Sequence, residues 1–246
     1  PRFARHATRL ATVSEFSRHD IATTYGVSEP HIDVVYNGVG EVFRPLTAEE
    51  IANSRTEFAQ GHPYITCVGS LNPRKNIARL LLAFDGLITE HGSELRLVIV
   101  GEKFWWDGNM KQAWDKVIHK DRVIFTGRLG QPKLHKALGG AECLAFVSYF
   151  EGFGIPVAEA MQCAVPVVAA EATSLPEIAG DAAYYCDPFS VSDITRALHE
   201  VCTDPEIQEK LRAAGPLRAK RYTWDKAATE LWNSFEKMLD DAGISQ

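Results

Sequence analysis

Short apolar and β-branched runs alternate with longer amphipathic runs from residue 64 onward. This alternation is typical of βαβ units, in which helices join parallel strands. Six runs fit strands: YITCVGS (64–70), LRLVIVG (95–101), VIFTG (123–127), CLAFVS (143–148), VPVVAA (165–170) and AAYYCD (182–187). The pattern therefore predicts an α/β fold with a doubly wound parallel sheet of about six strands.

Two amphipathic segments frame this sheet. After the first strand, apolar residues recur at helical spacing and predict a helix packed on the sheet: Ile77, Leu80, Leu81, Phe84, Leu87 and Ile88. The last segment also places a set of apolar residues on one helical face: Trp224, Ala227, Ala228, Leu231, Trp232, Phe235 and Leu239. Such a face needs a hydrophobic surface to lie on.

The first 62 residues do not follow the same alternation. RLATVS (9–14) and IDVVYNG (32–38) fit strands, separated by the helical EFSRHDIATTYG and followed by a polar segment. That break indicates an interdomain linker. We expect four parts: residues 1–45 from a separate domain and the start of the linker, a linker over 46–62, the α/β domain over 63–222, and a terminal helix over 223–246.

Composition narrows the class of protein. The 246 residues are 46% hydrophobic and carry a formal net charge of −6, which argues against nucleic acid as the main partner. Five widely spaced cysteines fit neither a CxxC metal site nor a complete disulfide framework: Cys67, Cys143, Cys163, Cys186 and Cys202. We therefore expect reduced core thiols in a cytoplasmic protein.

The chain shows no apolar run of 18 or more residues and no signal peptide at its start, PRFARHATRL. We expect a chain that does not span a membrane, with peripheral contact at the inner face left open. The missing initial Met leads us to expect an upstream segment, although an engineered chain would look the same.

The segment YFEGFGIPVAEAMQC (149–163) carries the first candidate site. It follows a predicted strand, and Pro156 suits the first turn of a helix, so the residues after it should be helical. Gly152 and Gly154 would let backbone amides approach a ligand closely. A phosphate-binding loop and a plain glycine-rich turn are both consistent with this pattern.

Glu151 and Glu159 lie on either side of that loop, with seven residues between them. Carboxylates beside a bound diphosphate are electrostatically costly unless they accept hydrogen bonds from neutral hydroxyls. Ribose and sugar hydroxyls are suitable donors. The structural alternative is a helix-dipole partner at Glu159 and a solvated acid at Glu151.

Other predicted strand ends carry further candidates. Arg74 and Lys75 in GSLNPRKN could supply positive charge to a diphosphate or be solvated residues at a helix start. FTGRLG places Gly127, Arg128 and Leu129 where backbone could press against a flat base or simply turn. Trp105 and Trp106 could line a cleft or cover an edge.

Several common catalytic patterns are missing from the sequence. The histidines do not follow an HExxH spacing and the acids do not form an EF-hand loop, so we expect no protein-bound metal. GxSxG and GxxxxGK[ST] are also missing, which argues against a common serine hydrolase or a P-loop protein.

These motifs together resemble the group-one (family 4) retaining, nucleotide-sugar-dependent glycosyltransferases, which have two facing Rossmann-like domains (the GT-B fold). EGFGIPVAEAM resembles the family's signature of two glutamates separated by seven residues, and SLPEIAGDAAYYCDP resembles the segment after it. VGSLNPRKN resembles the phosphate clamp. TVSEFSRHDI, VVYNGV and FRP resemble the end of the acceptor domain and the linker.

The resemblance implies a role for each matching position. Glu159 would hold the ribose hydroxyls, Glu151 would lie at the donor sugar, and Lys75 with Arg74 would neutralise the leaving phosphate. The remaining donor-binding residues would be Phe153, Gly154, Ile155, Gly69, Ser70, Gly127, Arg128 and Leu129. Ser70 replaces an Arg common in the family, and Ala164 replaces a frequent Gly, at a cost of roughly 1 kcal/mol if that site is left-handed.

The resemblance also implies an activity: transfer of a hexosyl unit from a GDP- or UDP-linked sugar to a glycan or lipid-linked acceptor, with no cofactor. GSLNPRKN with GEKFWW looks most like mannosyltransferases that use GDP-mannose. The acceptor domain of such enzymes would precede this chain, so the fragment alone should bind nucleotide without transfer. A non-catalytic nucleotide-binding module and a GT-B epimerase or phosphorylase remain the alternatives.

Overall fold

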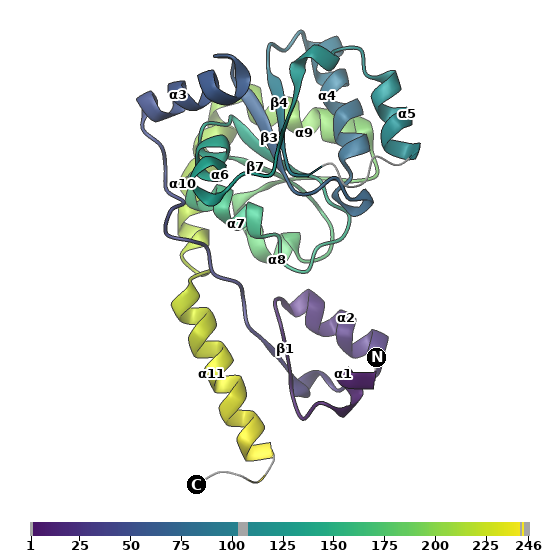
Figure 1. Ribbon diagram of the computed structural model, residues 1–246, viewed down its shortest axis with the longest axis vertical. Helices are drawn as coiled ribbons and strands as arrows, with labels where there is room; N and C mark the ends of the chain where they lie inside the picture. Colours follow the sequence, from purple (N-terminus) through teal and green to yellow (C-terminus); the bar gives the residue numbers. More distant parts are fainter. Residues whose placement is uncertain (1, 103–107, 242, 244–246) are drawn as a thin grey trace.

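The computed structural model describes residues 2–102, 108–241 and 243. Its centre is a parallel sheet of six strands in the order β5-β4-β3-β6-β7-β8 (Figure 1). The strands are β3 (Tyr64–Val68), β4 (Arg96–Val100), β5 (Val123–Gly127), β6 (Cys143–Phe146), β7 (Val167–Ala170) and β8 (Tyr184–Cys186). Each lies within a run predicted from the sequence, so the doubly wound α/β fold is confirmed.

Helices cover both faces of this sheet. One core packs against α4 (Ile77–His91), α5 (Gly108–Lys116) and α9 (Val191–Thr203). The other packs against α6 (Gln131–Gly139), α7 (Ile155–Gln162) and α8 (Leu175–Ala179), with α10 (Pro205–Ala219) reaching both. Strand β3 shows the division, because Ile65 and Cys67 face the first core while Tyr64 and Val68 face the second.

The strand order reverses between β3 and β6, which makes this position the topological switch point of the sheet. From β3 the chain continues to β4 and β5 on one side, and from β6 it continues to β7 and β8 on the other. In β3–β6 pairing, Ile65 lies opposite Cys143. Ligands in open α/β sheets bind outside the carboxyl ends of strands at such a reversal. A ligand would therefore bind beside the loops after Val68 and Phe146.

The polar segment 46–62, predicted as a linker, contains a regular helix, α3 (Ala48–Ala59). Thr47 and Glu50 form a reciprocal capping box at its start, and Phe58 and Ala59 are buried against the second core. A helix with a satisfied N-terminus and a small buried face is stable on a domain surface despite its polar composition. The assignment of domain boundaries along the chain stays a prediction.

The N-terminal residues form a small unit beside the sheet domain (Figure 1). Strands β1 (Leu10–Thr12) and β2 (Ile32–Val34) lie within the two predicted runs and pair in parallel. Parallel neighbours need a crossover connection between them. That crossover is α2 (Glu15–Tyr25), preceded in the chain by α1 (Arg2–His6). Short 3-10 turns occur at Glu29–His31, Pro73–Lys75, Lys120–Arg122 and Gly180–Ala182.

The last helix, α11 (Trp224–Asp241), extends from the sheet domain along the N-terminal unit (Figure 1). Asp33 in β2 accepts hydrogen bonds from Ser234 at 2.8 Å and Lys237 at 2.7 Å, and Arg9 pairs with Asp241 at 2.7 Å. Most of the predicted apolar face is nevertheless exposed: Trp224, Leu231, Trp232, Phe235 and Leu239. Polar contacts to Asp33 and Arg9 therefore hold the second half of this helix, while Ala227 is buried near its start.

Two whole-chain expectations can be compared with the fold. Four of the five cysteines are buried free thiols and Cys202 is partly exposed. Among the residues that the structure describes, no helix combines the length and apolar character needed to cross a bilayer.

Candidate functional site

The loop after β3 places two cations, Arg74 and Lys75, at the switch point of the sheet. Pro73 opens a 3-10 turn over Pro73–Lys75, and the Asn72 side chain accepts a hydrogen bond from the backbone N–H of Arg74 at 3.1 Å. Asn76 then adopts a left-handed conformation, with φ of 59°, before α4 begins. The turn fixes Arg74 and Lys75 at the start of that helix, where the sequence predicted them.

Glu151, in the loop after β6, contacts both cations. Its Oε1 lies 2.7 Å from Nζ of Lys75 and 2.8 Å from the guanidinium of Arg74. The Lys75 and Glu151 side chains are 10% and 8% exposed, whereas that of Arg74 is 43% exposed. The pair with Lys75 is therefore the better shielded, and the three groups together carry one net positive charge.

The backbone and surroundings hold this ion pair in place. The N–H of Glu151 donates to Oγ1 of Thr173 at 3.0 Å, and its carbonyl accepts from Oγ of Ser174 at 2.9 Å. Nζ of Lys75 lies 4.6 Å from the ring centroid of Phe146, a favourable cation–π position. Loops after β3, β6 and β7 thus converge on one acid and one amine.

The following loop leads into α7 and offers free donors. Gly154 has φ of 95°, and a Cβ there would lie 2.7 Å from Leu175 Cδ2, so glycine is required on both counts. The backbone N–H groups of Phe153, Gly154 and Ile155 have no acceptor among the described residues. Unpaired N–H groups at a helix start favour an anion.

Glu159 lies in the second turn of α7, as predicted, and is only 8% exposed. Its carboxylate makes no hydrogen bond to any residue that the structure describes. Burial raises the pKa of Glu159 to about 7. A buried acid without a partner disfavours its own ionised form, which makes it a candidate for a ligand that supplies hydroxyl donors.

A cavity of about 300 Å³ lies at the carboxyl ends of β3, β4 and β5. Four of the predicted donor-binding residues line it: Gly69, Ser70, Arg128 and Leu129. Gly127, whose φ is 71°, ends β5 just before them. These residues therefore lie around one space next to Lys75, since a Cβ on Gly69 would lie 2.9 Å from Cε of that lysine.

Sequence reasoning missed several residues of this region. Gly101 lets β4 approach β3, because a Cβ there would lie 2.0 Å from the carbonyl oxygen of Gly69. Glu102 lines the same cavity. Thr173 and Ser174 position Glu151. Thr173 gave no signal beyond its place before SLPE, and Ser174 opens that motif without having been assigned a role. A glycine directly after an apolar strand was the available signal for Gly101.

The N-terminal unit contacts the site loop directly. Oγ of Ser14 donates to the carbonyl of Gly152 at 2.6 Å, and the ring of Phe16 lies edge-on to Phe150 at 5.8 Å. The carboxylate of Glu177 accepts from the N–H of Glu15 at 2.7 Å and of Phe16 at 3.0 Å. The start of α2 is therefore fixed against the loop that carries Glu151.

Two further predictions concern single positions. Ala164, which follows α7, has φ of 55°, so the left-handed conformation anticipated there is present with a non-glycine residue. Trp105 and Trp106 lie outside the described residues.

The doubly wound sheet carries the cation–carboxylate contact at its switch point, with the cavity beside it. The family model for glycosyl transferases group 1 matches residues 49–218. The chain belongs to this family, and its predicted assignment is confirmed.

Curated relatives carry mannosyltransferase names. The O-antigen chain mannosyltransferase B of Escherichia coli is 29% identical over 94% of this chain and 61% of its own length. The MMP alpha-(1->4)-mannosyltransferase of Mycolicibacterium hassiacum is 30% identical over 97% of this chain and 56% of its own length. The chain thus spans about three fifths of the length of these two relatives.

Solved structures agree on the fold. Anabaena Alr3699/HepE, in complex with UDP and glucose, superposes with a TM-score of 0.82 at 19% identity, over 97% of this chain and 65% of that one. WaaG, a glycosyltransferase involved in lipopolysaccharide biosynthesis, gives 0.76 at 17% identity, over 92% and 61%. The GT-B assignment of the α/β domain is therefore confirmed.

Proposed function

We propose that this chain is the donor-binding half of a retaining glycosyltransferase that moves a hexosyl unit, mannose in preference, from a nucleoside diphosphate sugar to an acceptor hydroxyl. The observation that carries the proposal is the contact of Lys75 with Glu151, at 2.7 Å, beside three free backbone N–H groups. A shielded cation, an acid and unpaired donors at a switch point suit a diphosphate bonded to a sugar.

Each part of the donor has a matching group. The diphosphate would accept hydrogen bonds from the N–H groups of Phe153, Gly154 and Ile155 and from Lys75, with Arg74 outside it. Glu159 would accept the ribose hydroxyls, which would replace the water lost on its burial. The base would occupy the 300 Å³ cavity, pressed on the backbone of Gly127–Leu129.

The chemistry follows from the charges. The bond between the anomeric carbon and the terminal phosphate oxygen breaks, and the acceptor oxygen bonds to the same carbon on the same face while its proton passes to the departing phosphate. Negative charge grows on the diphosphate in this step. Lys75, Arg74 and the start of α7 would stabilise that charge, which raises the rate more than it raises ground-state affinity. We propose that these groups take the place of a metal ion.

Glu151 would lie at the donor sugar and would also position Lys75. Because its Oε1 already binds that amine, an incoming diphosphate would share the lysine rather than displace it. The carboxylate would then be aimed at the sugar hydroxyls on the side away from the phosphate.

The donor identity rests on the relatives. Two relatives named as mannosyltransferases support mannose, and GDP-mannose is the proposed donor. The Anabaena protein was solved with UDP and glucose, so a UDP-hexose is the competing candidate. The acceptor, a glycan or lipid-linked glycan at the inner face of a membrane, would bind mainly to a separate acceptor domain.

Calorimetric titration of this chain with GDP-mannose, UDP-glucose and ADP-glucose tests the proposal. We expect saturable binding of GDP-mannose, unchanged by a chelator, and weaker binding of the other two. Equal affinity for all three would remove the preference for GDP-mannose, and binding of none would refute the donor site. Following the anomeric proton by NMR, with the full-length protein, would test retention.

A further inference from the structure

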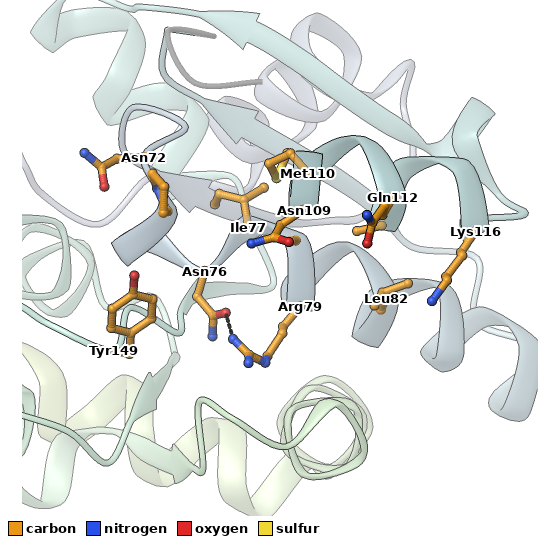
Figure 2. A pocket seen from close by; sticks show the side chains of 13 residues that line it. Asn72, Asn76, Ile77, Arg79, Leu82, Asn109, Met110, Gln112, Lys116 and Tyr149 are labelled. Atoms are coloured by element: carbon orange, nitrogen blue, oxygen red, sulfur yellow. Dashed lines mark hydrogen bonds between the residues drawn. The ribbon is translucent and has the colours of Figure 1, made fainter. Parts of the chain in front are cut away.

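A second cavity, of about 380 Å³, lies between the start of α4 and helix α5 (Figure 2). It falls within the range of small-molecule pockets, roughly 300–1,000 Å³. None of its lining residues belongs to the set that lines the strand-end cavity or to the ion pair of Lys75 and Glu151. It is therefore a distinct space on the same domain.

Its charge is opposite to that of the protein. The chain has 32 acidic and 26 basic residues, yet in the described part of the chain the charged residues lining this cavity are Arg79 and Lys116, with no Asp or Glu. Among the residues that the structure describes, neither cation pairs with a carboxylate. Two unneutralised cations facing one space attract an anion.

Arg79 is held ready for such a ligand. One guanidinium nitrogen donates to Oδ1 of Asn76 at 2.9 Å (Figure 2). The guanidinium also lies 5.4 Å from the ring centroid of Phe189. Asn76 is itself fixed, because its Nδ2 donates to the carbonyls of Val147 at 3.0 Å and Pro188 at 2.6 Å. The remaining guanidinium donors suit a phosphate, and little side-chain freedom remains to be lost on binding.

The other polar residues suit hydroxyl groups. Asn72, Asn109 and Gln112 contribute amides that both donate and accept, and Tyr149 contributes a ring and a hydroxyl. Figure 2 shows Tyr149 at one end of the group and Lys116 at the other. A phosphate ion alone would leave most of this space empty.

We propose that this cavity binds a hexose phosphate, with the phosphate on Arg79 and Lys116 and the sugar hydroxyls on the amides and Tyr149. The phosphate could belong to a free sugar phosphate or to a phosphorylated residue of a glycan. Either source presents the same group to the cavity. The proposal concerns binding alone and does not depend on the transferase activity.

The cavity also borders the turn that carries the two cations of the first site. Asn72 caps the N–H of Arg74, and the N–H of Tyr149 donates to the carbonyl of Arg74 at 3.1 Å. Asn72 and Tyr149 line the cavity, so a ligand there contacts the residues that fix the turn of Arg74 and Lys75. Occupancy should therefore alter affinity at the donor site, and the reverse.

Methyl NMR provides a local readout, because the chain has three methionines. Met110 lines this cavity, Met161 is a buried residue of α7, and Met238 lies on α11. Methyl-labelled protein would be titrated with mannose 1-phosphate, methyl α-mannoside 6-phosphate, mannose and inorganic phosphate. We expect saturable shifts of Met110 with the sugar phosphates, and at least about fivefold weaker binding of the two simpler probes.

Variants connect that shift to the two cations. Lys116→Gln, at an exposed position, should lower the affinity for the sugar phosphate about threefold or more. The double variant Arg79→Gln, Lys116→Gln should lower it about tenfold or more. Lys111→Gln, on the same helix but outside the cavity, is the matched control and should leave affinity within about twofold. The methyl spectrum itself reports whether each variant is folded.

The two sugar phosphates distinguish the sources. Tighter binding of mannose 1-phosphate indicates a free sugar phosphate, and tighter binding of the blocked 6-phosphate indicates a glycan-borne one. The proposal is overturned if Met110 does not shift, if mannose binds as well as its phosphates, or if Lys116→Gln and the double variant bind like the parent protein.

Discussion

Nζ of Lys75 lies 2.7 Å from Oε1 of Glu151, joining loops that follow two neighbouring strands of the sheet. The two residues are 76 positions apart in the chain. Both side chains are at most 10% exposed, so solvent screens their attraction little. The fold therefore brings an acid and an amine from distant parts of the chain together at the proposed donor site.

Glu151→Gln should destabilise the protein. The substitution leaves Lys75 shielded without a carboxylate, and we expect a loss of about 2 kcal/mol in the free energy of unfolding. Adding Lys75→Met should recover part of that loss, giving a coupling energy of roughly 1–3 kcal/mol in urea denaturation. Glu57→Gln, whose carboxylate lies 4.0 Å from exposed Lys136, is the control and should change the value by less than about 0.5 kcal/mol.

Glu159 should make stability depend on pH. The folded pKa of Glu159, about 7, lies above the unfolded value of 4.5. Burying its ionised carboxylate therefore costs no stability below pH 4.5, and the cost grows as the pH rises above 4.5. At pH 8 this burial costs about 3 kcal/mol, because one pKa unit equals about 1.4 kcal/mol. Glu159→Gln should therefore gain stability relative to the parent between pH 5 and pH 8, measured by urea denaturation at both. A constant difference would contradict the assigned cause.

Replacing Ala164, which has a left-handed backbone conformation, by glycine should stabilise the protein. Ala164→Gly removes a Cβ from a backbone with φ of 55°, and we expect the free energy of unfolding to rise by about 1 kcal/mol. Ala160→Gly, at a fully buried position within α7, should lower it by at least about 1 kcal/mol. If both substitutions changed the free energy of unfolding in the same direction, backbone strain at Ala164 would not explain the effect of Ala164→Gly.

Glu177 should hold the N-terminal unit on the sheet domain. Its carboxylate accepts from two N–H groups at the start of α2 and from the hydroxyl of Tyr36 at 2.8 Å. Burial, followed by the hydrogen bond to Glu177, raises the pKa of that tyrosine. Glu177→Gln should therefore speed amide hydrogen exchange at Glu15 and Phe16 about tenfold, since roughly 1–2 kcal/mol of capping is lost. Tyr36→Phe keeps the Glu177 carboxylate as acceptor for these two N–H groups, so it should have a smaller effect on their exchange.

Local pattern was sufficient for the sheet but not for every helix. The six strands were predictable because both faces of a parallel sheet are buried, which leaves nearly continuous apolar runs such as RLVIV. Helix α3 was missed because it is mostly polar, and its buried residues are few: Ser54, Phe58 and Ala59. The capping pair Thr47 and Glu50 was the available signal.

The site was predictable as a set of positions but not as contacts. Strand-end motifs identified Lys75, Glu151 and the cavity residues, yet nothing local indicates that an amine and a carboxylate 76 positions apart share a hydrogen bond. The hydroxyls of Thr173 and Ser174 that hold Glu151 come from a third loop. The cavity between α4 and α5 is assembled from isolated polar residues on several segments, without a motif. Such relationships depend on the folded topology.

The most direct test of the account is calorimetric titration of GDP-mannose into this chain and three variants at pH 8. We expect Lys75→Ala and Glu159→Gln each to weaken binding by about tenfold or more, because each removes a charged hydrogen bond to the donor. Lys133→Ala, exposed at the start of α6, should remain within about twofold of the parent. Parent-like affinity in both the Lys75 and Glu159 variants would contradict the proposed donor site.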